Sequence, residues 1–105
     1  MTELIGTKPA HATTSAYVSA LKVKVPPHIK GLLIHLAEDN VNAVKFKILG
    51  SSDDSRYEML KGDTIIAKNG STYETLTDAW LWVDIQVKDS VAETHGSVTV
   101  NVTGA

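Results

Sequence analysis

The 105-residue chain contains no cysteine, which excludes disulfides, thiolate catalysis and zinc–thiolate sites. It also has no apolar run near the ~20 residues that a membrane-spanning helix needs, so we expect no membrane partner. The first residues, MTELIGTKPAHATTSA, lack a basic start followed by an apolar stretch, so we expect no secretory signal. The formal net charge is −2, whereas a general nucleic-acid binder is basic, so we expect no nucleic-acid partner.

Charge is unevenly divided along the chain. Residues 1–50 hold six lysines and three acids, a charge of +3, whereas residues 51–105 hold three lysines, one arginine and nine acids, a charge of −5. Such an asymmetry can steer subunits together, or it can cancel inside one fold whose early and late strands lie side by side. We favour cancellation within the fold.

Residues that could serve catalysis or metal binding lack the spacing that these functions need. The serines lie in turns without a Gly-x-Ser-x-Gly elbow, and there is no glycine-rich phosphate loop. The chain has four histidines: His11, His28, His35 and His95. They show no short metal-ligand spacing, and the acids near Asp53 match no calcium loop. The sequence therefore predicts no enzyme activity, no metal, no cofactor and no small-molecule ligand.

Short stretches of alternating apolar and polar residues follow one another, with turns between them. They occupy residues 16–25, 32–39, 43–50, 64–76, 78–90 and 97–103, and the polar stretch over residues 50–63 is expected to be a loop with a short helical turn or strand near Tyr57 to Leu60. No segment carries a long 3.6-residue period, and regular alternation is typical of antiparallel strands with one solvent-exposed face. The sequence predicts an all-β fold, an antiparallel β-sandwich (jelly-roll or Ig-like) of about seven to eight strands.

Three local predictions accompany this fold. Residues 1–15 have too little apolar surface to offset their ordering entropy, so we expect a flexible N-terminal arm before a single domain at residues 16–105. The Asn69-Gly70 pair between two β-prone runs predicts a hairpin over residues 64–76. In the first strand, alternation predicts these inward residues: Tyr17, Ser19, Leu21, Val23 and Val25.

The stretch DAWLWVDIQVKDS, residues 78–90, poses the main question about function. Its alternate apolar residues predict a buried face made of Ala79, Leu81, Val83, Ile85 and Val87. We expect a common core made of Leu81, Val83, Ile85, Phe46, Ile48, Val98 and Val100. Trp80 and Trp82 then point outward with Asp84, on the face that should meet water.

Three explanations for the outward tryptophans remain open. A β-bulge could turn one ring inward, or the two rings could form a platform for a sugar ring. Alternatively, the N-terminal arm, a loop or a neighbouring subunit could cover both rings, and we favour this last explanation because aromatic residues are enriched in interface cores. The candidate interface residues are Trp80, Trp82, Asp84, Lys45 and Lys47.

Two segments carry a resemblance to a known group of proteins. VNAVKFKILGSSDD, residues 41–54, and WVDIQVKDSVAETHGSVTVNVTG, residues 82–104, resemble small β-sandwich modules in structural proteins of tailed bacteriophages. The shared pattern is an Asn-containing turn, a strand ending in Ile-x-Gly-Ser, an acidic loop, and a strand ending in Val-Lys, then Asp or Ser, then Ser, before a last Val-rich strand. The likeness covers about residues 30–104 and includes no catalytic residue.

The resemblance implies a structural component of the virion. The first choice is a head decoration (cement) protein that stabilises the phage head, and the second is a head-fibre or tail-associated protein. We expect a homo-oligomer, with a trimer favoured, that binds the major capsid protein and is made in the host cytoplasm. The alternative function is a carbohydrate-binding module that uses Trp80 and Trp82 as its sugar platform.

Overall fold

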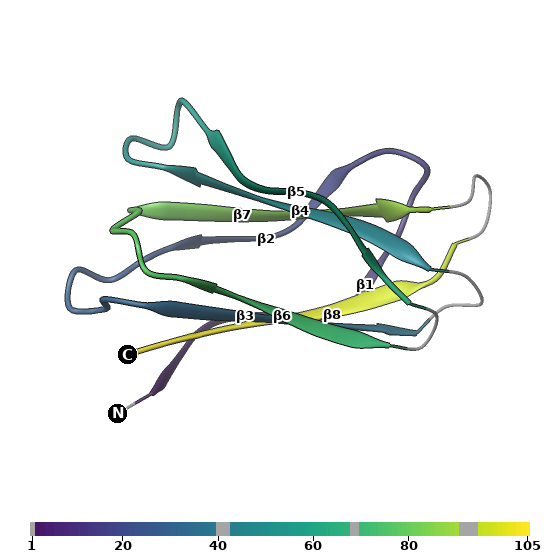
Figure 1. Ribbon diagram of the computed structural model, residues 1–105, viewed down its shortest axis with the longest axis horizontal. Coiled ribbons are helices and arrows are strands. Elements are labelled where there is room, and N and C mark those ends of the chain that lie inside the picture. The colour runs from purple at the N-terminus through teal and green to yellow at the C-terminus, as the bar shows by residue number, and fades with distance from the viewer. Residues whose placement is uncertain (1, 40–42, 68–69, 91–94) are drawn as a thin grey trace.

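The computed structural model describes residues 2–39, 43–67, 70–90 and 95–105, and these residues form eight strands and no helix. The strands are β1 (Glu3–Ala12), β2 (Val18–Lys24), β3 (Leu32–Asp39), β4 (Val44–Ser51), β5 (Glu58–Ile66), β6 (Ser71–Leu76), β7 (Trp82–Asp89) and β8 (Ser97–Gly104). Two antiparallel four-stranded sheets, ordered β1-β8-β3-β6 and β2-β7-β4-β5, face each other (Figure 1). The predicted antiparallel sandwich is confirmed. Within the described ranges, no helix is long and apolar enough to cross a membrane.

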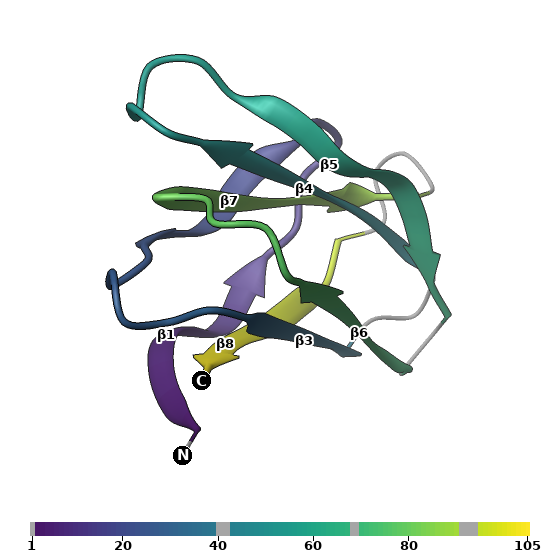
Figure 2. The same cartoon turned by 60° about the vertical axis from the view of Figure 1, so that its left-hand side comes forward.

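The strand pairing explains the topology. β1 pairs with β8, β2 with β7, β3 with β6 and β4 with β5. The chain is therefore one long hairpin, with its tip between β4 and β5, rolled into two layers, which is the jelly-roll arrangement. Rolling places β5 and β6 in different sheets (Figure 2). The predicted hairpin over residues 64–76 is therefore wrong, and its turn residue Asn69 lies outside the described residues.

The core lies between the two sheets and follows the predicted alternation. Of the predicted core residues, six are fully buried: Phe46, Ile48, Val83, Ile85, Val98 and Val100. Leu81 is 44% exposed, so the prediction is wrong for this residue. The reason is that β7 begins only at Trp82, and the bend before it breaks the alternation.

The N-terminal segment belongs to the sandwich. Residues 3–12 form β1, so the expectation that residues 1–15 lack regular structure is wrong. Ile5 packs against the core, and Gly6 allows a close approach, because a Cβ there would lie 2.6 Å from Val23 Cγ1. β1 is an edge strand that is held mainly by backbone pairing with β8. Its polar sequence therefore does not show that it is a strand.

A β-bulge in β2 changes which residues face inward. The register with β7 shifts between Ser19 and Leu21. Beyond the shift, Leu21 and Val23 pack against the core as predicted. Before it, Tyr17 and Ser19 contact the outer side of the sheet, so the inward prediction is wrong for these two residues. A single extra residue is enough to reverse the faces of a strand.

Candidate functional site

The outer face of the β2-β7-β4-β5 sheet brings together most of the residues that the sequence singled out. Residues directly opposite each other in a ladder point to the same side of a sheet. Lys24 lies opposite Trp82, Lys22 opposite Asp84, and Lys45 opposite Lys88 on this outer side. We call this surface the lysine–aromatic face, and its charged and aromatic residues are Tyr17, Lys22, Lys24, Lys45, Lys47, Asp54, Tyr57, Asp63, Trp82, Asp84 and Lys88. Ile65 lies on the same side, opposite Lys45.

Trp82 is surrounded by lysine side chains of the adjacent strand. The Nζ atoms of Lys22 and Lys24 lie 5.6 Å and 5.8 Å from the centre of its ring. A cation within about 6 Å of an aromatic ring centre is attracted by the ring quadrupole. The indole is therefore partly covered by lysine side chains of its own chain.

Tyr17 forms a second aromatic centre on the same face. The Nζ atoms of Lys47 and Lys88 lie 4.5 Å and 5.5 Å from its ring centre, and its hydroxyl donates to the Asp63 carboxylate. Burial, followed by this hydrogen bond, raises the pKa of Tyr17. The same hydrogen bond, followed by the charges of Lys45, Lys47 and Lys88, lowers the pKa of Asp63. The bulge in β2 is what places Tyr17 here, and sequence alternation could not find it.

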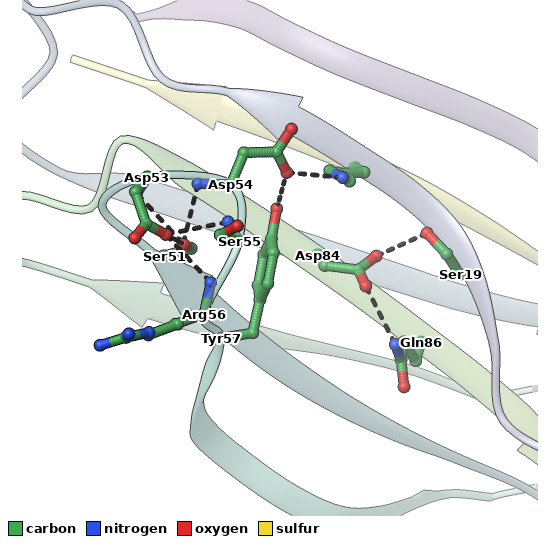
Figure 3. A network of polar contacts seen from close by, with 10 residues as sticks. Ser19, Ser51, Asp53, Asp54, Ser55, Arg56, Tyr57, Asp84 and Gln86 are labelled. Atoms are coloured by element: carbon green, nitrogen blue, oxygen red, sulfur yellow. Dashed lines mark hydrogen bonds and ion pairs between the residues drawn. The ribbon is translucent and has the colours of Figure 1, made fainter.

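Asp54 ties the acidic loop after β4 to strand β2. Its carboxylate lies 2.6 Å from Lys22 Nζ and accepts a hydrogen bond from the Tyr57 hydroxyl (Figure 3). The contact with Lys22, followed by that with Tyr57, lowers the pKa of Asp54, and the contact with Asp54 raises the pKa of Lys22. The ion pair joins the basic first half of the chain to the acidic second half, which agrees with the favoured cancellation of charge.

The remainder of this loop is held by its own backbone. Asp53 Oδ1 accepts hydrogen bonds from the N–H groups of Ser55 and Arg56, at 2.9 Å and 3.0 Å. These two bonds, with Arg56 the larger contributor, lower the pKa of Asp53. The loop carboxylates are thus engaged within the chain, and the described parts of the structure contain no group of three or more His, Asp or Glu residues that could hold a metal ion.

Asp84 is the most enclosed charged group of the face, with 9% of its surface exposed. Its two carboxylate oxygens accept hydrogen bonds from Ser19 Oγ at 2.5 Å and from Gln86 Nε2 at 2.9 Å (Figure 3). Because both oxygens already have donors and the residue is largely buried, little of the carboxylate is accessible to a partner.

The lysine–aromatic face is positive although the whole chain is negative. Five lysines and three aspartates give it a charge of +2, whereas the formal net charge of the chain is −2. Its aspartates are each bound to groups of the same chain. The surplus charge therefore resides on lysine ammonium groups around two aromatic centres.

Trp80 does not belong to this face. It packs against the core, and a Cβ on Gly50 would lie 2.6 Å from its Cδ2 atom. The expectation that Trp80 and Trp82 point outward together is therefore wrong, because the bend over residues 78–81 turns one ring inward while Leu81 becomes exposed. The two-tryptophan sugar platform is not formed. Trp82, Asp84, Lys45 and Lys47 do share one face, and their role as an interface stays a prediction.

A hollow lies beside Trp80 at the end of the sandwich. Its volume is about 380 Å³, and its walls include Pro26, Pro27 and Leu81. Lys30 is the single charged residue among those that line it. Specific small-molecule sites combine an apolar wall with several convergent polar groups, and this lining does not supply such a set.

The outer face of the β1-β8-β3-β6 sheet has a different chemistry. Three rows of cross-strand neighbours cross it: Leu4, Thr103, Leu33 and Thr75; Thr7, Asn101, His35 and Tyr73; Thr99, Ala37 and Ser71. These three rows contain no lysine, arginine, aspartate or glutamate, and the next row, Ala12, Ser97 and Asp39, adds one aspartate at the end of the face. We call this surface the threonine face. The two outer faces of the sandwich therefore suit different partners.

No protein-family model matches the sequence, and no curated protein matches it. Solved structures are similar in fold. SPBc2 prophage-derived protein YomS has a TM-score of 0.63 at 13% identity, over 99% of this chain and 90% of that chain. PirA has a TM-score of 0.63 at 8% identity, over 96% of this chain and 92% of that chain. VP2 of the infectious bursal disease virus subviral particle has a TM-score of 0.55 at 13% identity, over 98% of this chain and 32% of that chain.

At these identities the likeness shows the fold alone. The expected similarity to phage proteins is confirmed at that level, because YomS is prophage-derived and superposes over nearly its whole length. The same sandwich also occurs in PirA and in a third of the VP2 chain.

Proposed function

We propose that the chain is a structural protein of a bacteriophage virion, and that it binds the outer surface of the head through the lysine–aromatic face as a decoration or cement protein. The observation that carries this proposal is the ordering of that face. Its aromatic rings lie among lysine ammonium groups and its carboxylates are satisfied within the chain. The sandwich fold shared with a prophage-derived protein and with a viral particle protein supports a virion role.

The physics of such a contact favours this face. Side chains that are already ordered lose little conformational entropy on binding, so more of the contact energy appears as affinity. Aromatic rings provide large rigid contact areas, and charges around them set the orientation of the partner. The surplus of positive charge fits a major capsid protein that exposes carboxylates on the head surface.

The first experiment asks whether the chain is part of the particle. Virions of the phage that encodes it are purified by density gradient, and their proteins are identified by mass spectrometry. We expect the chain at a stoichiometry comparable to that of other head proteins. Its absence from purified particles would overturn the proposal.

The second experiment asks which face binds. Purified protein is sedimented with heads that lack it, and the bound fraction is measured. Lys45→Glu combined with Lys47→Glu should abolish binding, and Trp82→Ser should weaken it, whereas Leu33→Ser on the threonine face should bind as the wild type does. Binding should also weaken as salt is raised, because exposed charges are screened. Loss of binding with Leu33→Ser alone would assign the contact to the opposite face.

A further inference from the structure

The four edge strands differ in how well they are protected against pairing with another chain. β1, β2 and β5 each contain a register shift. β1 also contains Pro9 and has a positive φ of 45° at Ala10, and β5 has Gly62 followed by a φ of 34° at Asp63. Bulges, prolines and irregular backbone are the devices by which edge strands avoid edge-to-edge pairing. β6 has none of them and pairs with β3 in an unbroken register.

The composition of β6 also favours further pairing. Its sequence is STYETL, in which threonine and tyrosine favour extended structure. Its one charged residue, Glu74, lies 3.6 Å from Lys61 Nζ within the same chain. Tyr73 is 64% exposed although it sits in the middle of the strand. β6 forms the margin of its sheet (Figure 2), so its outer row of backbone groups has no partner strand among the described residues.

We propose that β6 pairs antiparallel with β6 of a second copy of this chain, about a two-fold axis at Tyr73. In this register Tyr73 lies beside its own copy, and Ser71 lies opposite the partner subunit's Thr75. Thr72 lies opposite the partner subunit's Glu74, whose carboxylate can accept a hydrogen bond from the threonine hydroxyl. The strand is therefore complementary to itself, with aromatic and hydroxyl pairs that stabilise antiparallel ladders. This inference does not depend on the proposed function.

The competing registers are less favourable. A two-fold axis at Glu74 would place two carboxylates opposite each other, and like charges in directly opposed positions destabilise a sheet. An axis at Thr72 would move part of the pairing beyond the start of β6 at Ser71. The register at Tyr73 joins the two β1-β8-β3-β6 sheets into a continuous eight-stranded sheet. Both threonine faces then lie on one side of the dimer, and both lysine–aromatic faces lie on the opposite side.

The register can be tested with single cysteines, because the chain has none of its own. Opposed residues in an antiparallel ladder have Cα atoms about 4.5–5.5 Å apart, which suits a disulfide. Tyr73→Cys should therefore form a disulfide-linked dimer under mild oxidation. In Thr75→Cys, the matched exposed control, the two thiols lie four residues apart along the ladder, about 13 Å, and should not bridge. We expect a difference in rate of at least about tenfold. Equal rates would overturn the register.

The dimer itself is tested by sedimentation velocity over a range of concentrations. The wild-type chain should sediment as a dimer at high concentration. Tyr73→Lys should raise the dimer dissociation constant at least about tenfold, because it opposes two ammonium groups at the axis. Ile65→Lys is the matched control on edge strand β5, where Ile65 is 59% exposed, and it should leave the dimer unchanged. A wild-type monomer, the trimer favoured from the sequence, or a dimer that Tyr73→Lys leaves intact would overturn the inference.

Discussion

Trp80 and Trp82 are two residues apart in the sequence but have different surroundings, so replacing each by alanine should have different consequences. Trp80 packs against the core at the end of the sandwich, in contact with the backbone of Gly50. Trp82 lies on the outer face and contacts lysine side chains. We therefore expect Trp80→Ala to lower the free energy of unfolding much more than Trp82→Ala.

The structure gives the expected size of each effect. Truncation of a fully buried tryptophan costs about 3–5 kcal/mol, and Trp80 is only partly buried, so we expect about 2–3 kcal/mol. Trp82 loses two cation–π contacts in a partly exposed setting, which together contribute about 1 kcal/mol. In a domain of this size, each kcal/mol lowers the melting temperature by roughly 4–8 °C.

Urea unfolding followed by far-ultraviolet circular dichroism measures these values without relying on the fluorescence of the ring that is removed. Gly50→Ala provides a linked test, because its Cβ would lie 2.6 Å from Trp80 Cδ2 and 2.8 Å from Leu60 Cδ1. Such overlap costs about 1–3 kcal/mol. Much of that cost should disappear in the Trp80→Ala background, where the indole is gone. If Trp80→Ala and Trp82→Ala are equally stable, or if the Gly50→Ala cost is unchanged without the ring, the inward placement of Trp80 is refuted.

Three further predictions concern stability. Deleting residues 2–12 should lower the melting temperature strongly, because it removes the strand that pairs with β8. An unchanged melting temperature would instead support the expectation that these residues are a flexible arm. Burial raises the pKa of Tyr17 above its usual value of 10.0, so the folded state keeps a proton that the unfolded chain loses. Stability should therefore fall as pH rises above about 10, and urea unfolding at pH 9 and 11 should show a smaller fall for Tyr17→Phe. Thr13→Val should cost about 1–3 kcal/mol, since it removes a donor from the buried Asp89 carboxylate, and Thr13→Ser should cost less.

The sequence predicted the core where the strands are regular. β8 alternates throughout and β4 alternates up to Gly50, and Phe46, Ile48, Val98 and Val100 are buried as the alternation requires. The same reasoning failed for Leu81, because a period of two gives no sign of a bend. A local irregularity of one residue reverses every side chain on one side of it, and composition alone does not reveal where such irregularities fall.

Two other failures have a common physical cause in long-range pairing. β1 looks like a flexible arm because an edge strand needs few apolar residues, yet its partner strand lies at the other end of the chain. The Asn69-Gly70 pair is a strong local hairpin signal, but β5 and β6 find their partners in different sheets. In a rolled hairpin, the partner of a strand can lie far away in the sequence, and local turn chemistry cannot report which strand that is.

The candidate site was predictable in part for the same reasons. Trp82, Asp84, Lys45 and Lys47 share a face because they alternate with core residues on two neighbouring strands. Tyr17 escaped prediction because it reaches this face only through the bulge in β2. The other residues of the face come from the bulged strand β2, from the acidic loop after β4 and from β5, and they contact one another through hydrogen bonds and an ion pair. Their positions depend on tertiary structure, so the sequence alone could not predict them.

The strength of head binding should depend on β6 as well as on the lysine–aromatic face. The face has a charge of only +2, and its aspartates are held within the chain, so one copy should bind weakly. Pairing through β6 directs two such faces to the same side, and a bivalent contact gains affinity through effective concentration without any new contact. Tyr73→Lys should therefore weaken co-sedimentation with heads although Tyr73 lies on the opposite sheet, whereas Lys45→Glu with Lys47→Glu should abolish binding without changing the sedimenting mass. If Tyr73→Lys produces a monomer that binds heads as tightly as the wild type does, each face acts alone and the two surfaces are independent.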